Sequence, residues 1–263
     1  MTRLGLMIRA KTLFLNLVFT VKRAITIFFL ILSFLGLQAQ VEKRNEDVKL
    51  YYRGSNSYGL TLHTQGWGIS YKKQVHLSYK LKRIYNFEFQ NLKHPKQEKV
   101  VNNFFDDSKG YYFGKINSLS HLRIGIGQQH AFASKEIRKG VQLAWVYGLG
   151  LNLGLMKPSY IEYFVDPTEA EVVRYDPSIH SPGLIRGRAG FFKGMNEIDL
   201  VPGIYGKFGL NFEYSPYDEK LKSMEVGVAV DWFYKEVPLM YDTYNKQYWI
   251  TLYLMLEIGK KIE

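Results

Sequence analysis

The sequence predicts an all-β protein, a transmembrane antiparallel up-and-down β-barrel of eight strands, and three observations predict this fold class. Seven or eight segments alternate between large apolar residues and small or polar ones, as strands do when their two faces meet different surroundings. Aromatic residues lie where these segments meet their loops, as in the girdles of membrane barrels. An apolar run near the N-terminus is typical of an export signal.

The segment from Val141 to Leu155 shows the alternation most clearly, because every odd position holds a large apolar residue. A helix would spread these side chains around its axis, since it repeats every ~3.6 residues. Gly148, Gly150 and Gly154 would each cost a helix about 1 kcal/mol relative to alanine. A strand instead places all the apolar side chains on one face, so a strand is predicted here.

The same rule predicts strands at 55–64, 67–75, 82–91, 111–128, 141–156, 199–214, 223–235 and 247–260. A soluble β-sandwich would also alternate, but the non-apolar faces here carry glycines and isolated charges where a solvated face would carry Thr, Lys and Glu. Gln65 and Gly66, between the first two segments, form either a hairpin turn or a bulge within one long strand.

Loop lengths indicate the two sides of the membrane. Long connections are expected at 92–110, 157–198 and 236–246, with shorter ones at the other rim, as in outer-membrane barrels with long external loops and short periplasmic turns. Ten strands are the alternative, because Tyr160–Phe164 and Leu184–Phe192 could form another hairpin. Prolines in the middle of that connection argue against strands at membrane depth.

Residues 1–39 are predicted to be a cleavable signal peptide. Lys22 and Arg23 precede fourteen uncharged, mostly apolar residues, and the small residue Ala39 stands at the expected cleavage site. A retained anchor helix is the alternative, although neither apolar run in this region reaches the roughly 18 residues of a spanning helix. The region before Lys22 is long for a signal peptide, which favours a translation start near Val21.

The expected mature protein consists of a periplasmic segment, 40–54, and a barrel, 55–263, in the outer membrane of a Gram-negative bacterium. The full chain carries a net charge of +11; without residues 1–39, which hold five basic and no acidic side chains, 30 basic and 24 acidic residues remain, an excess of +6. The mature chain has no run of basic and aromatic residues that indicates nucleic-acid binding. The absence of cysteine excludes disulfides and thiol catalysis.

Successive side chains of a strand point to opposite faces, and this alternation, called strand parity here, predicts which side chains face the lumen and which face lipid. The ionisable residues expected in the lumen are His63, Glu88, His121, Arg123, Lys207, Glu213, Glu225, Asp231 and Glu257. The residues expected to face lipid include Leu143, Trp145, Tyr147, Leu149, Leu151, Leu153, Val228, Trp232, Leu252 and Leu254. An eight-stranded barrel has just enough interior for side chains, so the mixed charges are expected to form an ion-paired plug. A narrow water-filled pore is the alternative.

The sequence offers little support for catalysis or for cofactor or metal binding. Ser120 and His121 are the nearest approach to a nucleophile and base, but adjacent strand residues point to opposite faces. The histidines lack metal-ligand spacing, and Asp106-Asp107 lacks a calcium-loop pattern. No cofactor, metal or catalytic residue is therefore predicted, and a lipid or peptide hydrolase or acyltransferase stays a secondary alternative.

The expected external loops combine basic and aromatic residues. The candidates are Lys93, His94, Lys96, Phe104, Phe105, Arg186 and Arg188. Such groups could bind lipopolysaccharide phosphates at the outer rim or dock another outer-membrane or periplasmic protein. A solvated loop without a binding role, held to the protein by a few apolar side chains, would have the same composition.

Four motifs carry a resemblance to a known group of proteins. They are L-Q-A-Q at 37–40, H-T-Q-G-W-G at 63–68, N-L-K-H-P-K at 91–96 and G-L-G-L-N-L-G-L-M-K-P at 148–158. With them the chain resembles the small, largely uncharacterised outer-membrane β-barrel proteins of the Bacteroidota type. The resemblance implies an outer-membrane barrel and carries over no active site. The chain departs from other bacterial barrels in ending without an aromatic residue.

These observations together favour a non-enzymatic integral barrel that serves as a structural or partner-binding component of an envelope complex for secretion, assembly or uptake. A small passive pore is the first alternative, and a membrane hydrolase or acyltransferase is the second.

Overall fold

The structure is a computed structural model, and it describes residues 52–105, 108–133, 141–166, 169–214, 219–241, 243 and 245–262. The predicted signal peptide, its cleavage site at Ala39 and most of the predicted segment 40–54 lie outside these residues. In the part of the chain that is described, no helix has the length and apolar character needed to cross a bilayer.

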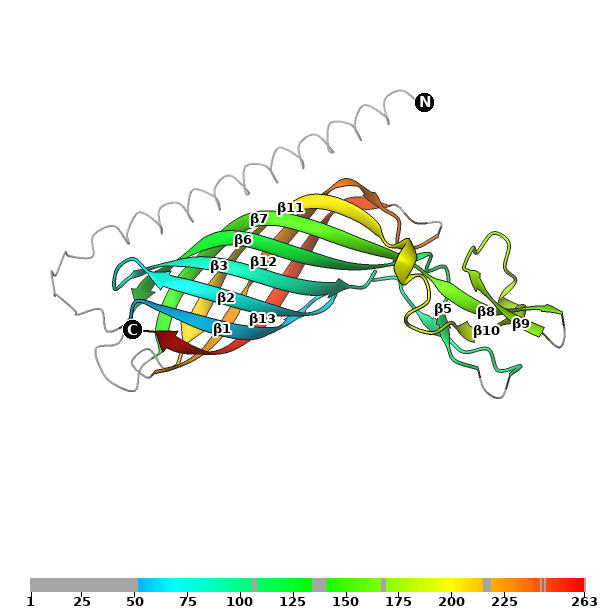
Figure 1. Cartoon of the computed structure of the whole chain (residues 1–263), viewed down its shortest axis with the longest axis horizontal. Helices are drawn as coiled ribbons and strands as arrows, with labels where there is room; N and C mark the ends of the chain where they lie inside the picture. The colour runs from blue at the N-terminus through cyan, green and yellow to red at the C-terminus, as the bar shows by residue number, and fades with distance from the viewer. Residues whose placement is uncertain are drawn as a thin grey trace, which may run out of the picture. The chain divides into compact units, whose positions relative to one another are not determined.

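Eight strands close into a barrel in the order β1-β13-β12-β11-β7-β6-β3-β2 (Figure 1). They are β1 (Gly54–His63), β2 (Gly66–His76), β3 (Leu81–Leu92), β6 (Asn117–Ala133), β7 (Gln142–Pro158), β11 (Asp199–Glu213), β12 (Lys220–Val237) and β13 (Lys246–Ile262). Every neighbouring pair is antiparallel, and β1 pairs with β13 to close the wall. The predicted fold class is confirmed.

The first two strands form the hairpin that was one of the two interpretations of Gln65-Gly66. β1 and β2 pair antiparallel from Gly54 opposite Val75 to His63 opposite Gly66, so the alternative of one bulged strand is wrong. Gly66 has a φ of +155°, and a Cβ at this position would collide with the carbonyl oxygen of Asn91 on β3. A glycine is needed here because it adopts this φ without a steric penalty and leaves room for the carbonyl group of Asn91.

The strand predicted at 111–128 begins six residues later, at Asn117, and continues to Ala133. Tyr111 and Tyr112 instead form β5 (Tyr111–Tyr112), which pairs with β4 (Lys99–Val100) outside the barrel. Gly114, with a φ of +69°, lies between β5 and β6. The long loop predicted at 92–110 therefore runs from 93 to 116, because the backbone leaves the extended region before the barrel strand starts.

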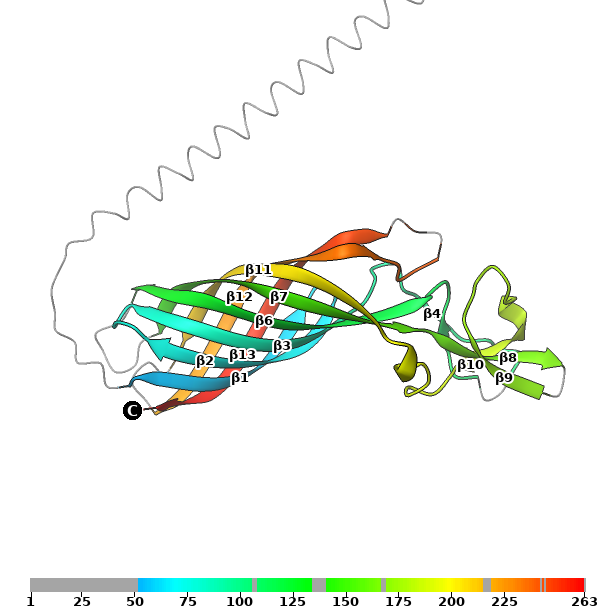
Figure 2. The same ribbon diagram turned by 45° about the horizontal axis from the view of Figure 1, so that its top comes forward.

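The connection predicted at 157–198 contains three further strands and two 3-10 turns. β8 (Tyr160–Asp166) pairs with β9 (Glu169–Arg174) and β10 (Ile185–Arg188) in the order β10-β8-β9, with η2 (Pro182–Leu184) and η3 (Met195–Glu197) beside them. This sheet lies beyond one end of the barrel (Figures 1 and 2). The ten-strand alternative is wrong, because the additional hairpin pairs within its own sheet rather than with the barrel wall.

Residues 93–116 and 159–198 pack together into one unit, named here the outer module. Tyr111, Ile161, Tyr175 and Ile185 form its buried cluster. The amide of Asn102 donates a hydrogen bond to the carbonyl oxygen of Ile185 at 2.9 Å and thereby joins its two segments. The long loops are thus a folded structure with its own core.

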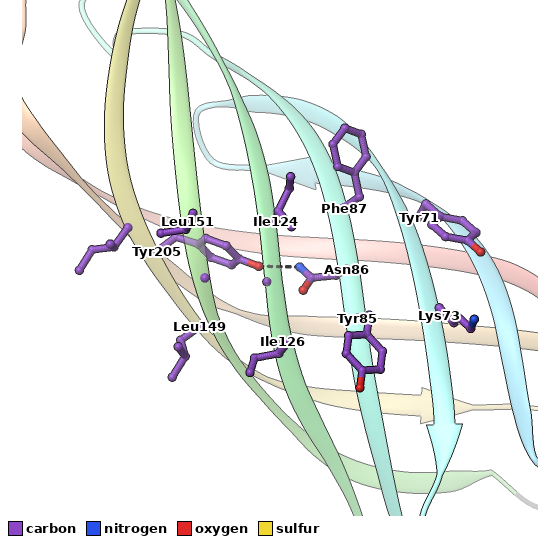
Figure 3. A pocket seen from close by; sticks show the side chains of 13 residues that line it. Tyr71, Lys73, Tyr85, Asn86, Phe87, Ile124, Ile126, Leu149, Leu151 and Tyr205 are labelled. Atoms are coloured by element: carbon purple, nitrogen blue, oxygen red, sulfur yellow. Dashed lines mark hydrogen bonds between the residues drawn. The ribbon is translucent and has the colours of Figure 1, made fainter.

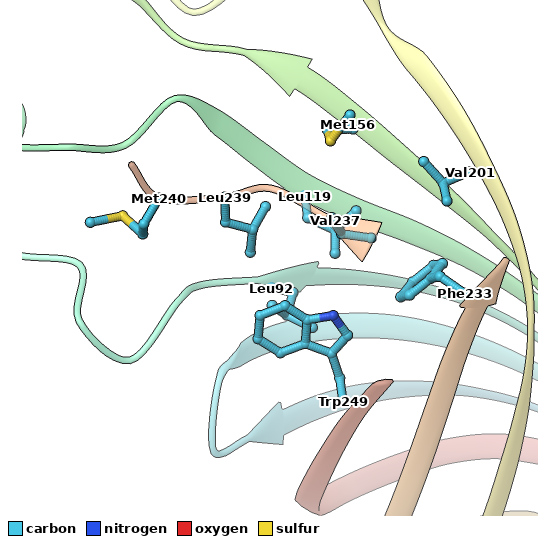
Figure 4. Packing of buried hydrophobic residues seen from close by; sticks show 9 residues of the cluster. All are labelled: Leu92, Leu119, Met156, Val201, Phe233, Val237, Leu239, Met240 and Trp249. Carbon is cyan, nitrogen blue, oxygen red and sulfur yellow. The ribbon is translucent and has the colours of Figure 1, made fainter. Parts of the chain in front are cut away.

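A second buried cluster closes the barrel at the end that carries the outer module (Figure 4). It consists of Leu92, Leu119, Met156, Val201, Phe233, Val237, Leu239, Met240 and Trp249. Met240 belongs to the loop after β12, which runs from 238 to 245 rather than over the predicted 236–246. This end is called the outer rim, and the end with the turn at 77–80 is called the inner rim.

Candidate functional site

Buried charged side chains from several strands meet inside the barrel. Arg123 on β6 contacts Asp231 on β12, with Nε to Oδ1 at 2.8 Å, and Glu88 on β3, with Nη1 to Oε2 at 3.2 Å. Lys207 on β11 reaches the other oxygen of Glu88 at 2.6 Å. Asn152 donates to Asp231 at 2.7 Å. The contact between Arg123 and Glu88 joins neighbouring strands. The contacts of Arg123 with Asp231 and of Lys207 with Glu88 join non-adjacent strands across the lumen, because a barrel of this size lets opposite walls touch.

The network continues from Lys207 toward the inner rim. Lys72 on β2 forms an ion pair with Glu225 at 2.6 Å and also contacts Glu257. The hydroxyl of Tyr253 donates to Glu225 at 2.7 Å, and Ser223 donates to Glu257 at 2.8 Å. Each of these two carboxylates therefore meets a cation and a neutral donor. These ion pairs and hydrogen bonds offset the free-energy cost of burying the charged carboxylates away from water.

A separate group near the inner rim is built around Glu213. Lys82 lies 2.7 Å from one carboxylate oxygen, and Lys261 lies 3.0 Å from the other. Together with Lys72, these two lysines were absent from the lumen set expected from sequence. They bring the cations described in the network to five, matching five carboxylates. Strand parity could have found them, because Lys72 shares the face of Ser70, and Lys82 that of Glu88.

Side-chain burial shows that the interior is filled at the level of this network. Asp231 and Glu225 have exposed fractions of 0%, and Glu88 and Lys72 have 1%. Water inside an open channel would contact the side chains that line it. The structure therefore places the charged residues in a packed interior.

His121 and His63 lie toward the outer rim, above the ion pairs. His121 is fully buried, its ring lies 6.1 Å from that of Phe233, and neither ring nitrogen has a hydrogen-bond partner among the described residues. His63 is half-buried and accepts a hydrogen bond from the amide of Gln65 at 3.3 Å. Ser120 lies on the other face of β6, where Asn91 donates to its hydroxyl at 3.2 Å. Ser120 and His121 therefore form no nucleophile and base pair.

Residues with ligating side chains do not gather into a candidate metal site. Among the residues that the structure describes, no group of three or more His, Asp or Glu side chains could hold an ion. Asp106 and Asp107 lie outside these residues.

Tyr205 occupies the lumen beside two glycines. Gly125 and Gly150 are cross-strand partners on β6 and β7, and the Tyr205 ring lies against both. Asn86 donates to the Tyr205 hydroxyl at 2.7 Å, and the Arg123 guanidinium lies 5.3 Å from the ring centre. The two glycines thus make room on the inner wall for an aromatic ring that packs beside the ion pairs.

Gly125→Ala is expected to destabilise the barrel by about 1–3 kcal/mol, because the new methyl group would meet the Tyr205 hydroxyl and, at 2.6 Å, the carbonyl oxygen of Leu149. Gly206→Ala is the matched control: the nearest atom to its Cβ is 3.9 Å away, so a change within about 0.5 kcal/mol is expected. Urea unfolding of both variants in the same detergent measures the difference. Equal stabilities would contradict the packing described for Tyr205.

The side chains expected to face lipid lie on the outer face of the wall. Leu149 and Leu151 are 68% and 70% exposed, and Trp145, Tyr147, Val228, Trp232 and Leu252 are also exposed. Leu143, Leu153 and Leu254 are partly covered by neighbours. In water so large an apolar surface would be costly, whereas hydrocarbon solvates it.

Three lysines come together at the outer rim from three segments. Lys93 follows β3, Lys115 precedes β6, and Lys157 lies near the end of β7. Partial burial, together with the charges of Lys93 and Lys157, lowers the pKa of Lys115 to about 8. Lys115 was missed in the sequence because it fell within the strand predicted at 111–128, and Lys157 was not among the candidates although it begins the predicted connection 157–198. The cluster is a concentration of positive charge suited to an anion.

The other loop candidates have separate positions. His94 packs edge-on to Trp249 at 6.2 Å, and Lys96 is exposed. Phe105 stacks on Phe164 at 4.7 Å, whereas Phe104 is 87% exposed.

The two arginines of β10 also differ in their surroundings. Arg186 lies 3.8 Å from Glu162 in an ion pair, and Arg188 is exposed. Together with Phe104 and Phe105, they lie in the part of the outer module remote from the wall, whereas His94, at the start of the module, packs against Trp249 of the barrel. The sequence-predicted loop residues therefore do not form one site.

The closed antiparallel wall, its apolar outer face and its filled, charged interior define a transmembrane β-barrel with a folded external module. No protein-family model matches the sequence, and no curated protein matches it.

Among solved structures, the chain is similar to Neisserial surface protein A, with 9% identity over 80% of this chain and 96% of that chain and a TM-score of 0.39. It is also similar to Ail, the attachment invasion locus protein of Yersinia pestis, with 10% identity over 80% and 97% and a TM-score of 0.35. A third similar structure is a major outer membrane protein from Thermus thermophilus, with 9% identity over 80% of this chain and 98% of that chain and a TM-score of 0.39.

Proposed function

We propose that this protein is a non-enzymatic integral barrel of a Gram-negative outer membrane, exported by a signal peptide cleaved near Ala39. The barrel, whose lumen is filled, anchors the protein in the membrane, and the outer module binds a partner protein of the envelope. The motifs at 63–68, 91–96 and 148–158 support a kinship with the Bacteroidota-type small barrels. The observation that carries the proposal is the buried ion-pair network, because it leaves the barrel a structural rather than a conducting role.

Reconstituted into planar bilayers, the purified protein is expected to give no steady single-channel steps at neutral pH. An ion would have to displace paired side chains such as Glu88 and Arg123, which costs several kcal/mol. A porin inserted into the same bilayers is the positive control. Steady steps from this protein would support the alternative of a small passive pore.

The outer module presents apolar side chains that no contact in the barrel requires. Phe104, Phe191 and Phe192 are 87%, 74% and 79% exposed. The rings of Phe191 and Phe192 lie 5.5 Å apart, and contiguous exposed aromatic side chains of this kind are typical of surfaces that dock a partner. Affinity purification from native outer membranes, with the wild-type chain and with Phe104→Ser, tests this role. A protein captured by the wild type and lost with the variant supports it, and the absence of any stoichiometric protein contradicts it.

The lysine cluster at the outer rim supports a second contact, with lipopolysaccharide phosphates. Since the pKa of Lys115 is lowered to about 8, this ammonium is charged below pH 8 and neutral above it. Binding of purified lipopolysaccharide is therefore expected to weaken several-fold between pH 7 and pH 9. Lys115→Met should bind more weakly at pH 7 and should lose this pH dependence. A pH profile shared by wild type and variant would contradict a role for Lys115.

A further inference from the structure

A groove of about 820 Å³ crosses the lipid-facing wall (Figure 3). Its walls are two rows of outward side chains that the strand register aligns. One row consists of Lys73, Tyr85, Ile126 and Leu149. The other lies two residues away on each strand and runs from Tyr71 to Leu151 and on to Ile204. The residues between the rows point inward, so the floor is the wall itself, at positions such as Gly125 and Gly150.

The groove runs diagonally from the inner rim toward the middle of the membrane. At one end, Lys73 lies three residues from His76, the inner end of β2. At the other end, the row that begins with Lys73 reaches Gly206, seven residues from each end of β11. The five strands crossed lie about 4.8 Å apart, so the groove spans about 19 Å. Because strands of such barrels tilt by about 35–45°, a groove of this length across them rises by roughly 12 Å along the membrane normal, which lies within the ~15 Å depth of one leaflet.

Positive charge is found at the inner-rim end of the groove. Lys73 and Arg83 are both exposed and point outward on the neighbouring strands β2 and β3. Within the described part of the chain, neither side chain forms an ion pair with a carboxylate. Tyr85, opposite Lys73, adds a phenol at the same level. An apolar channel with two cations at its mouth is complementary to a lipid that has an acyl chain and a negative headgroup.

We propose that this groove binds an anionic phospholipid of the inner leaflet, with one acyl chain lying between the two rows and the phosphate on Lys73 and Arg83. The site rests on the barrel being embedded in the membrane, and it is independent of what the outer module binds. The site is separate from the lysine cluster at the outer rim, since its lipid enters from the opposite leaflet.

Native mass spectrometry of the delipidated protein, with phosphatidylglycerol or phosphatidylcholine added at equal concentrations, tests the proposal. Phosphatidylglycerol is expected to remain bound at a defined stoichiometry and phosphatidylcholine to be lost. Lys73→Gln/Arg83→Gln should weaken retention of phosphatidylglycerol by about tenfold or more, since each cation near the membrane surface contributes roughly a fivefold factor. Migration before and after heating on gels checks that the variant is folded.

Lys222→Gln/Lys260→Gln is the matched control, because these lysines are exposed on β12 and β13 near the same rim, away from the groove. It should retain phosphatidylglycerol as the wild type does. Ile126→Trp fills the groove without changing the charge and should also reduce retention. If both double variants lose the lipid equally, or if phosphatidylcholine binds as well as phosphatidylglycerol, the specific site is overturned. Unchanged retention by Ile126→Trp would show that no chain lies in the groove and would likewise overturn it.

Discussion

Leu151→Arg is expected to block assembly of the barrel in the membrane, at a cost of about 2–4 kcal/mol. Leu151 lies near the middle of β7, is 70% exposed and points toward lipid. A guanidinium at this depth would lose its water without gaining a partner, and its side chain is too short to reach either rim from the middle of the strand. The fraction folded after insertion into lipid vesicles, measured by the heat-dependent shift in gel migration, reports the effect.

Two variants control for position and for loss of the leucine. Leu200→Arg places the same charge on an outward residue one position from the outer end of β11 and is expected to cost about 0–1 kcal/mol. Leu151→Ala removes the side chain without adding charge and should assemble. Equal folding of the two arginine variants would contradict the assignment of the exposed apolar band to hydrocarbon.

Arg123→Leu is expected to destabilise the barrel by about 3–5 kcal/mol, because it leaves Asp231 buried without its cation. Glu88 would retain Lys207, so most of the loss is expected at Asp231. Guanidinium unfolding in detergent, followed by tryptophan fluorescence, measures the change. The double variant Arg123→Leu/Asp231→Leu should recover much of the stability, since a buried pair replaced by apolar groups of similar size is often neutral.

The surface pair between Lys235 and Asp199 provides the comparison. Its atoms lie 2.6 Å apart, as close as those of the buried pairs, but the side chains are 45% and 47% exposed. Lys235→Ala is therefore expected to change stability by no more than about 1 kcal/mol. A similar small change for Arg123→Leu would show that the lumen is hydrated and that the network contributes little.

Sequence reasoning was accurate wherever a local repeat carried the information. The alternation along Val141–Leu155 predicted β7 within a few residues, because a strand alternates its side chains with a period of two whatever its neighbours are. It failed at 111–116, where Tyr111 and Tyr112 have the composition of a strand but pair with β4 outside the barrel. The choice between these pairings depends on contacts with Tyr175 and Ile161, which are distant in sequence.

In the lumen, too, the sequence predicted the direction of the side chains but not their contacts. Parity indicated that Glu88, Arg123 and Asp231 face inward, but their pairing across 35 and 108 residues depends on how the strands are staggered around the barrel. The groove beside Lys73 likewise exists only when register aligns five strands.

The sequence by itself thus determined which face of each strand is apolar and that the long loops share one rim, but it left the choice between eight and ten strands open. Only the tertiary structure decided which charges meet, how the outer module folds and where the wall is grooved. The physical reason is that alternation is a property of a single strand, whereas ion pairs, cores and grooves arise from the relative positions of segments far apart in the chain.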